Sequence, residues 1–398
     1  MTSTTSRTTP LPPWPSYTEE EIAAVHEVLA SGRVNYWTGD EGREFEREFA
    51  DYVGVAHGIA LANGSVAIEL ALIALGIGPG DEVIVTPRSF IASASSIVIR
   101  GATPVFADVD ADSQNITAAT VEPLIGPRTK AIICVHLAGW PCDMDPILTL
   151  ARKHNLKVIE DCAQAHGARY RGRPVGSFGD MAAFSFCQDK IMTTGGEGGM
   201  LVTNSQALWD TAWSYKDHGK RYATVYRPRE PHETGFRWVH ESFGTNFRMT
   251  EMQSAIGRVQ LRRLEDWVAQ RRRNAARLTE KLADEPALRI PLPDADSFHA
   301  YYKFYAFLDP ACLRPDWSRD HIIGEINARG VPCFTGSCSE VYLEKAFTES
   351  PYRQAQRLPV AQALGEQSLM FLVHPTLDEA DMGYVAQAVH EVLKDACR

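Results

Sequence analysis

The sequence predicts an α/β fold with a large, mostly parallel sheet, followed by a smaller α+β domain. Between residues 57 and 163, five short apolar runs alternate with helix-like segments. The runs are apolar throughout, which is typical of parallel strands covered by helices on both faces. From residue 301 onward strand-like and helix-like segments are mixed, as in a separate α+β unit.

Length and composition indicate a globular enzyme. The chain has 398 residues with 44% apolar and 23% charged residues, enough for two or three domains with sizeable cores. A formal charge of −10 argues against a broad nucleic-acid or anionic-membrane surface. The eight cysteines form no CxxC pair, which favours reduced thiols over disulfides or a zinc site. With no secretory signal and no long apolar run, we expect a cytoplasmic protein without a metal.

The first part of the chain follows this pattern element by element. Residues 1–15 are rich in Ser, Thr and Pro and are expected to form a flexible arm. A helix begins at Thr18, and Phe45, Phe49 and Tyr52 have helical spacing in a second one. The expected strands are 57–62, 82–87, 103–109, 131–137 and 157–163, and the expected helices between them are 66–77, 89–101 and 144–155.

The pattern changes after Gly179. Two further strands, 182–186 and 198–203, are joined by a Gly-rich connection. Residues 216–246 are polar and too long for an ordinary connection, which indicates a functional or partner-facing loop. A long helix is expected over 250–282, then a strand at 301–308 and helices at 320–329 and 378–395. We therefore place a large domain at 16–255 and a small domain at 256–398.

Three sites could carry chemistry. The turn Asn63-Gly64-Ser65 lies between a strand and a helix, where free N–H groups could hold a phosphate, although a simple helix cap also fits. Asp161 ends a strand, at the sheet edge where α/β folds bind ligands; it could hold a protonated ring nitrogen, or be a cap or an ion-pair member. Its neighbour Glu160 points the other way and is expected to be structural.

The third site is Lys190, which is followed by TTGGEGG rather than lying on a helix face. Taken alone, a lysine is usually a surface charge, but desolvation beside tight backbone would suit Schiff-base chemistry. An anion cradle, a strand-end carboxylate and a lysine are the parts that pyridoxal phosphate requires.

At this point the chain resembles the nucleotide-sugar (DegT-type) aminotransferases, pyridoxal-phosphate enzymes with the aspartate-aminotransferase-like fold (fold type I). The resemblance runs from about Tyr17 to the C-terminal helix. Its landmarks include LANGSVAIELAL (61–72), GDEVIVTPRSFIASASSI (80–97), EDCAQAHGA (160–168), GDMAAFSF (179–186), TNFRMTEMQSAIG (245–257) and HPTL (374–377). It implies a seven-stranded sheet in the large domain.

The resemblance also implies site roles. Lys190 would bind the cofactor covalently, Asp161 would pair with the pyridine nitrogen, and Gln164 would lie near the phenolic oxygen. Phe90 would stack on the cofactor ring, although an aromatic residue is more often part of a core.

The phosphate of the cofactor would be held by Gly64, Ser65 and Ser185. Asn246 matches an asparagine that reaches this phosphate from the neighbouring subunit, so the resemblance implies a homodimer with shared active sites.

The implied function is transfer of an amino group, with glutamate as donor, to a nucleotide-linked keto-sugar in amino-sugar and polysaccharide biosynthesis. Alternatives are a sugar deoxygenase of the same family, which typically has histidine in place of the lysine, and a regulatory protein that binds the cofactor without turnover. A free cyclitol could replace the sugar. A nicotinamide-dependent dehydrogenase is disfavoured because the first strand–helix turn lacks GxGxxG.

Some positions depart from the family pattern: Gly195-Gly196 where one glycine is common, Ala138 where a tyrosine is frequent, and the extended 216–246 loop. These departures concern substrate identity more than reaction type. Basic residues of the loop could meet a nucleotide diphosphate or could simply be solvated: Lys216, Lys220, Arg221, Arg227 and Arg229. His136 and His218 are expected to be structural or loop residues rather than acid–base catalysts.

Overall fold

The computed structural model describes residues 10–228 and 235–397, and its large domain is built on a seven-stranded sheet. The strand order is β1-β9-β8-β5-β4-β2-β3. The strands are β1 (His57–Leu61), β2 (Glu82–Val85), β3 (Thr103–Phe106), β4 (Thr129–Val135), β5 (Lys157–Asp161), β8 (Met181–Ser185) and β9 (Gly199–Thr203). All the strands expected between 57 and 203 are therefore present.

Only β9 runs against the others, because it pairs antiparallel with both β1 and β8 whereas β3, β2, β4, β5 and β8 pair in parallel. The register sets the end of β1 and the end of β8 opposite the same residue, Gly199. In β5, Asp161 is paired with Ala183, two residues before the end of β8. Three strands thus deliver their last residues to one edge of the sheet.

Helices cover both faces of this sheet, which explains why its strands are apolar throughout. One face packs against α3 (Gly64–Ala74), α4 (Ala92–Ile99) and α7 (Gln206–Lys216). The other packs against α2 (Glu41–Val53), α6 (Met144–His154) and the first half of α9 (Glu251–Leu282). Shorter elements of this domain are α5 (Ala118–Val121), η1 (Glu122–Leu124), η2 (Leu137–Gly139), β6 (Arg169–Tyr170) and β7 (Arg173–Pro174).

The small domain carries a four-stranded antiparallel sheet, β10 (Leu288–Arg289), β12 (Phe304–Leu308), β14 (Ser368–Phe371) and β13 (Cys333–Phe334). Its helices are α10 (Arg319–Ala328), α11 (Lys345–Thr348), α12 (Pro359–Gln367) and α13 (Glu379–Ala396), with η3 (Pro310–Cys312) and η4 (Val341–Leu343). β11 (Ser297–Phe298) pairs with β6 of the large domain. The expected strand 301–308 begins only at Phe304, because residues 300 and 302 hydrogen-bond to Gly139 and Ala138 instead.

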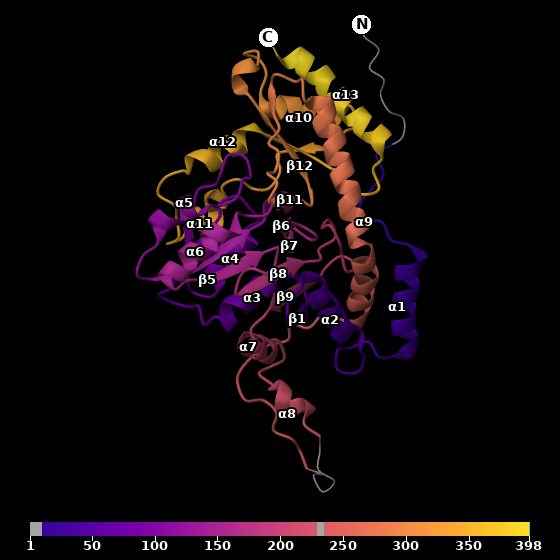
Figure 1. Cartoon of the computed structure of the whole chain (residues 1–398), viewed down its shortest axis with the longest axis vertical. Helices are drawn as coiled ribbons and strands as arrows, with labels where there is room; N and C mark the ends of the chain where they lie inside the picture. Colours follow the sequence, from indigo (N-terminus) through magenta and orange to yellow (C-terminus); the bar gives the residue numbers. More distant parts are fainter. Residues whose placement is uncertain (1–9, 229–234, 398) are drawn as a thin grey trace.

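The helix α9 joins the two domains (Figure 1). Thr250 caps it with a reciprocal capping box, and the helix then runs without a break from the large domain to the side of α13. The expected helix over 250–282 is confirmed. The domain boundary at 255/256 falls inside this helix and stays a prediction.

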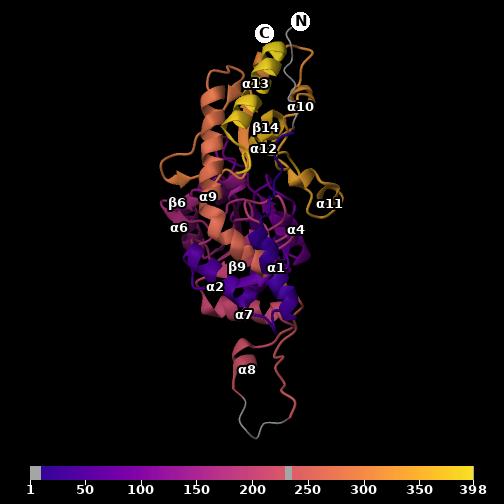
Figure 2. The same ribbon diagram turned by 90° about the vertical axis from the view of Figure 1, so that its right-hand side faces the viewer.

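The described parts of the long loop 216–246, residues 216–228 and 235–246, project from the large domain beyond α7 and contain α8 (Tyr222–Tyr226) (Figures 1 and 2). α1 (Glu19–Ser31) lies along the outside of α9. Of the expected flexible arm 1–15, residues 1–9 lie outside the described residues, whereas Leu11 packs against the core of the small domain and Trp14 hydrogen-bonds to the Lys190 carbonyl. In the described part of the chain, no helix combines the length and the apolar character that a membrane crossing requires.

Candidate active site

The turn at residues 63–65 is packed so tightly that it needs glycine. Asn63 caps α3 by accepting the Val66 N–H at 3.0 Å. A Cβ atom on Gly64 would lie 2.6 Å from the Cβ of Ser185, and one on Gly199 would lie 2.3 Å from the Asn63 carbonyl oxygen. The first N–H groups of α3 have no partners within the helix and carry the positive end of its dipole. Helix cap and anion cradle therefore coexist here, with Ser185 in contact with Gly64.

Asp161 is buried at the end of β5, where two polar groups orient its carboxylate. Ser93 donates its hydroxyl to Oδ2 at 2.7 Å, and the Ala163 N–H donates to Oδ1 at 3.1 Å. Ser93 is in turn hydrogen-bonded to Ser89 at 2.9 Å. The carboxylate is thus fixed by the start of α4 as well as by its own strand.

Phe90 and Gln164 are close in the chain to the residues that orient this carboxylate: the Phe90 carbonyl accepts the Ser93 N–H at 3.3 Å, and Gln164 follows Asp161 by three residues. Phe90 directly follows Ser89 and is 66% exposed, so it is not the core residue that an aromatic side chain usually is. Gln164 is buried; its Oε1 accepts the Ala138 N–H at 2.8 Å, and its Nε2 lies 3.5 Å from the Ser337 hydroxyl of the small domain. Ala138, which stands where the family frequently has tyrosine, therefore contacts Gln164 through its backbone N–H.

Lys190 lies in an irregular segment just after β8, and its Nζ is 5.0 Å from the centre of the Tyr302 ring. The Tyr302 hydroxyl donates to the carboxylate of Asp189. The Lys190 N–H donates to the Cys187 carbonyl at 3.0 Å, and its own carbonyl accepts the indole N–H of Trp14 at 2.8 Å. The lysine is therefore held between the N-terminal residues and the start of the small domain.

The surroundings of Lys190 are rich in buried positive charge. Burial lowers the pKa of Lys303 to about 8 and that of Arg271 to about 9. Burial, together with the charges of Lys190 and Arg271, lowers the pKa of His166 to about 3, so this imidazole is neutral at physiological pH. An excess of cations near the sheet edge favours an anionic ligand.

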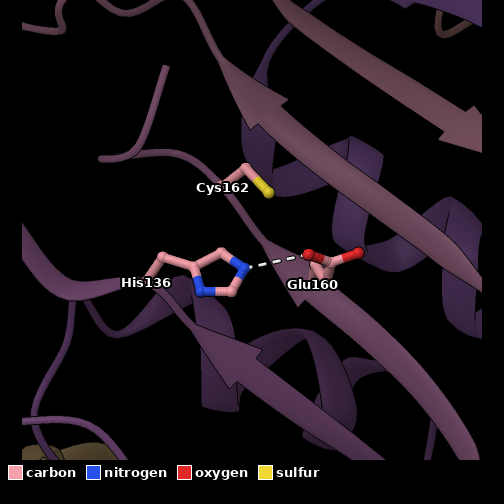
Figure 3. A group of neighbouring side chains, drawn as sticks. All are labelled: His136, Glu160 and Cys162. Carbon is pink, nitrogen blue, oxygen red and sulfur yellow. Dashed lines mark hydrogen bonds and ion pairs between the residues drawn. The ribbon is translucent and has the colours of Figure 1, made fainter. Parts of the chain in front are cut away.

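His136, Glu160 and Cys162 form a buried group at the ends of β4 and β5 (Figure 3). The nitrogen, oxygen and sulfur atoms of this group that could bind a metal lie within 4.8 Å of one another. His136 Nδ1 accepts the Cys142 N–H at 3.0 Å, so the proton is on Nε2, which donates to Glu160 Oε2 at 3.0 Å. Both ring nitrogens are thus engaged within the protein.

Glu160 also accepts the N–H groups of Gly176, Phe178 and Gly179 at 2.7–2.8 Å. Burial alone would raise the pKa of Glu160, but the His136 and backbone hydrogen bonds bring it below its usual value. Glu160 and His136 are therefore structural, as expected, and hold the 176–179 turn.

The 216–246 loop binds most of its basic residues within the chain. Lys216 is fully buried, with Nζ 3.8 Å from the Tyr36 ring centre, and burial lowers its pKa to about 8. Asp217 pairs with Lys220 at 3.1 Å and with Arg248 at 2.8 Å. Arg221 pairs with Glu241, and Arg229 lies outside the described residues. The loop therefore offers less free charge to a diphosphate than its sequence indicates.

Asn246 is exposed, in the strand-like pairing of this loop with Asp217. The next residue, Phe247, accepts the Ala62 N–H at 2.9 Å, so the Asn246 segment runs beside the turn that contains Gly64 in its own chain. Its contribution to a neighbouring subunit stays a prediction.

The structure adds three residues that sequence reasoning missed. Ser93 orients Asp161, and Trp14 binds the Lys190 carbonyl. Arg88 is fully buried and donates to Gln114 at 2.9 Å and to the small-domain residue Ser339 at 2.7 Å. The position of Ser93, three residues after Phe90, could have indicated the first; nothing in the sequence links Trp14 to residue 190.

These residues fit pyridoxal phosphate: a glycine-dependent helix N-terminus beside Ser185 of β8, a buried and oriented carboxylate at the end of the adjacent strand β5, and a lysine in the segment that follows β8. Fold and site together define a pyridoxal-phosphate enzyme with the aspartate-aminotransferase-like fold.

Comparison with known proteins agrees. The model of the DegT/DnrJ/EryC1/StrS aminotransferase family matches residues 15–390. The chain is 41% identical over 364 residues to the GDP-perosamine synthase of Caulobacter vibrioides, covering 90% of this chain and 92% of that one. It superposes on an aminotransferase from Psychrobacter cryohalolentis with a TM-score of 0.95 and 57% identity, covering 97% and 100% of the two chains. DesV of S. venezuelae gives a TM-score of 0.86 at 35% identity, covering 97% and 99%.

The chain belongs to the DegT/DnrJ/EryC1/StrS aminotransferase family. This confirms the sequence-based expectations of the family, the fold, the cofactor and a sugar aminotransferase activity.

Proposed function

We propose that this enzyme transfers an amino group from glutamate to the ketone of a nucleotide-linked sugar, as a cytoplasmic homodimer. The observation that carries this proposal is the meeting of Lys190, Asp161 and the Gly64 turn at one edge of the sheet. The name GDP-perosamine synthase, borne by a relative, supports a nucleotide-linked amino sugar as the product class.

Pyridoxal phosphate, when bound, supplies the electron sink that lets an amino group move between donor and ketone. Asp161, fixed by Ser93, would hold the proton on the ring nitrogen, and Gln164 would bind the phenolic oxygen. Phe90, whose side chain is exposed, would cover the ring face.

The remaining site residues would hold the phosphate and move protons. Gly64 and Ser65 offer backbone N–H groups and Ser185 offers its hydroxyl. Lys190 would hold the cofactor between reactions, then take the proton from the donor carbon and return it, as general base and acid. The same lysine would run these steps backward on the sugar ketone.

Lys190 is also the feature that disfavours a sugar deoxygenase, which is expected to have histidine at this position. A regulatory protein without turnover is disfavoured by the complete set of lysine, carboxylate and phosphate-binding residues.

The function is tested by adding glutamate alone to the yellow holoenzyme. The absorption band of the bound cofactor should bleach, with release of about one 2-oxoglutarate per site, because one lysine serves both substrates in turn. Keto-sugar nucleotides and cyclitol ketones are then screened for an amino product by mass spectrometry. A product that loses oxygen without gaining nitrogen, or no turnover with any ketone, would contradict the proposal.

Borohydride should fix the cofactor on Lys190, and Lys190→Ala should retain nothing reducible. A label on another lysine would show that the site is assigned to the wrong segment.

Shared active sites are tested by mixing two inactive variants, Lys190→Ala and Asn246→Ala. If Asn246 serves the neighbouring subunit, one site of each mixed dimer has both residues intact and activity returns. If mixed dimers form and stay inactive, Asn246 serves its own subunit.

A further inference from the structure

The N-terminal residues 11–17, here called the N-terminal strap, join the small domain to the segment that carries Lys190. Leu11 packs against the small-domain core, and the Pro13 carbonyl accepts the Thr376 hydroxyl at 3.0 Å. One residue later, Trp14 donates its indole N–H to the Lys190 carbonyl at 2.8 Å. A contact across 176 residues of sequence thus ends on the residue that is expected to bind the cofactor.

The Lys190 backbone has little other support. Residues 188–192 form turns and bends without helix or strand, and the Lys190 N–H is engaged in a local turn with Cys187. Among the described residues, the hydrogen-bond donor to the Lys190 carbonyl is the indole N–H of Trp14. A polar backbone group in such a half-buried place is costly to leave unpaired.

The indole itself is firmly oriented. It makes an edge contact with Trp267 at 5.1 Å between ring centres and stacks on His374 at 6.2 Å. The guanidinium of the fully buried Arg271 lies 5.2 Å from its ring centre. Trp267 and Arg271 belong to α9, and His374 follows β14, so the helix that joins the domains and the small-domain sheet together set the direction of the N–H group.

We propose that Trp14 is a positioning residue for Lys190. Its indole fixes the Lys190 carbonyl and thereby limits the positions that the side-chain amine of Lys190 can reach. The proposal rests on the proposed function, in which Lys190 must leave the cofactor, move a proton and return in every cycle. A displacement of about 1 Å at such a group can cost about a hundredfold in rate. Trp14 touches neither substrate nor cofactor in this role.

The test compares Trp14→Phe with Trp267→Phe. The first removes the N–H and keeps an aromatic ring; the second disturbs the same aromatic contact but removes no bond to Lys190. Two quantities are measured: hydrogen exchange of the 187–194 peptide in the apoenzyme, and the rate of bleaching of the holoenzyme by glutamate, resolved into its limiting rate constant and the half-saturating glutamate concentration. The visible circular dichroism of the bound cofactor is recorded as well.

In Trp14→Phe we expect faster exchange in 187–194, altered dichroism and a roughly tenfold lower limiting rate of bleaching at an unchanged half-saturating glutamate concentration, equivalent to about 1.4 kcal/mol. Trp267→Phe keeps the Trp14 N–H and its bond to the Lys190 carbonyl, so its effect on all three quantities should be clearly smaller than that of Trp14→Phe. If Trp14→Phe fails to fold, benzothienylalanine at position 14 removes the N–H while keeping the shape of the ring.

Wild-type exchange and dichroism in a folded Trp14→Phe would overturn the inference, as would equal effects of the two variants, since aromatic packing would then explain both. If the wild-type holoenzyme does not react with glutamate at all, the donor in the proposed function is wrong. The exchange comparison in the apoenzyme still decides the role of Trp14.

Discussion

Replacing Glu160 by glutamine should destabilise the large domain measurably, because one carboxylate accepts four hydrogen bonds there. Oε1 binds the N–H groups of Phe178 and Gly179, and Oε2 binds Gly176 N–H and His136 Nε2. Glutamine keeps one of these two oxygens as an acceptor. Its NH₂ group, which is itself a donor, replaces the other oxygen and faces the two N–H groups that this oxygen accepted. His136 cannot relieve this by changing tautomer, because its Nδ1 accepts the Cys142 N–H.

Two buried donors without acceptors cost about 1–2 kcal/mol each, so Glu160→Gln should lose about 2–4 kcal/mol. With about 2.1 cal/mol/K of unfolding entropy per residue, a chain of 398 residues should melt about 2–5 °C lower. Thermal unfolding of the apoenzyme at pH 7 measures this. The control is Glu122→Gln, whose exposed pair with Lys153 should contribute little.

The loss should also depend on pH. The hydrogen bonds hold the pKa of Glu160 below its usual value, so its contribution is complete above about pH 4.3 and disappears as pH falls through the lower folded value. The melting difference between wild type and Glu160→Gln should therefore shrink in strong acid. Equal melting temperatures at pH 7 would refute the assignment of Glu160 as the anchor of the 176–179 turn.

Three further changes test other parts of the site. Gly64→Ala should weaken pyridoxal phosphate affinity by tenfold or more, measured by equilibrium dialysis, because its Cβ would collide with Ser185; affinity equal to wild type would show that the turn is not the cradle. Ser93→Ala should lower kcat about three- to tenfold without changing cofactor content, since Asp161 loses an orienting hydrogen bond; unchanged kcat would place Ser93 outside the mechanism. Asp217→Asn should cost about 3 kcal/mol in urea unfolding by leaving Arg248 without its buried acid, and a stable variant would contradict this pairing.

The order and type of the large-domain elements could be predicted from the sequence because both faces of the sheet are buried. The apolar run 131–137 corresponds to β4, and similar runs correspond to the strands on either side of it. The sequence predicts a strand from residue 301, three residues before β12 begins at Phe304, because Tyr301 and Tyr302 are as strand-like as the residues after them. Tertiary hydrogen bonds to the 138–139 turn, which no local pattern encodes, decide where the strand begins.

In the site, residues at strand ends could be predicted and those that hold them could not. Asp161 and Gly64 are recognisable because a parallel sheet brings such positions to one edge. The partners Ser93, Trp14 and Tyr302 come from a helix start, the N-terminal strap and the small domain. The basic residues of 216–246 were the opposite case: composition indicated free charge, whereas Asp217 and Glu241 neutralise several of them within the fold.

The placement of α9 has a consequence for dividing the chain. Its first residue, Glu251, accepts the N–H groups of Glu41 and Gly42 at the start of α2, and its far end, around Leu278 and Leu282, packs in the small-domain core. A fragment ending near residue 255 would keep the cap on α2 but lose most of α9, which covers one sheet face together with α2 and α6. A fragment beginning there would carry a helix with half its apolar contacts exposed. Each half alone should therefore aggregate, whereas the two co-expressed as separate chains would have to rejoin along this one helix.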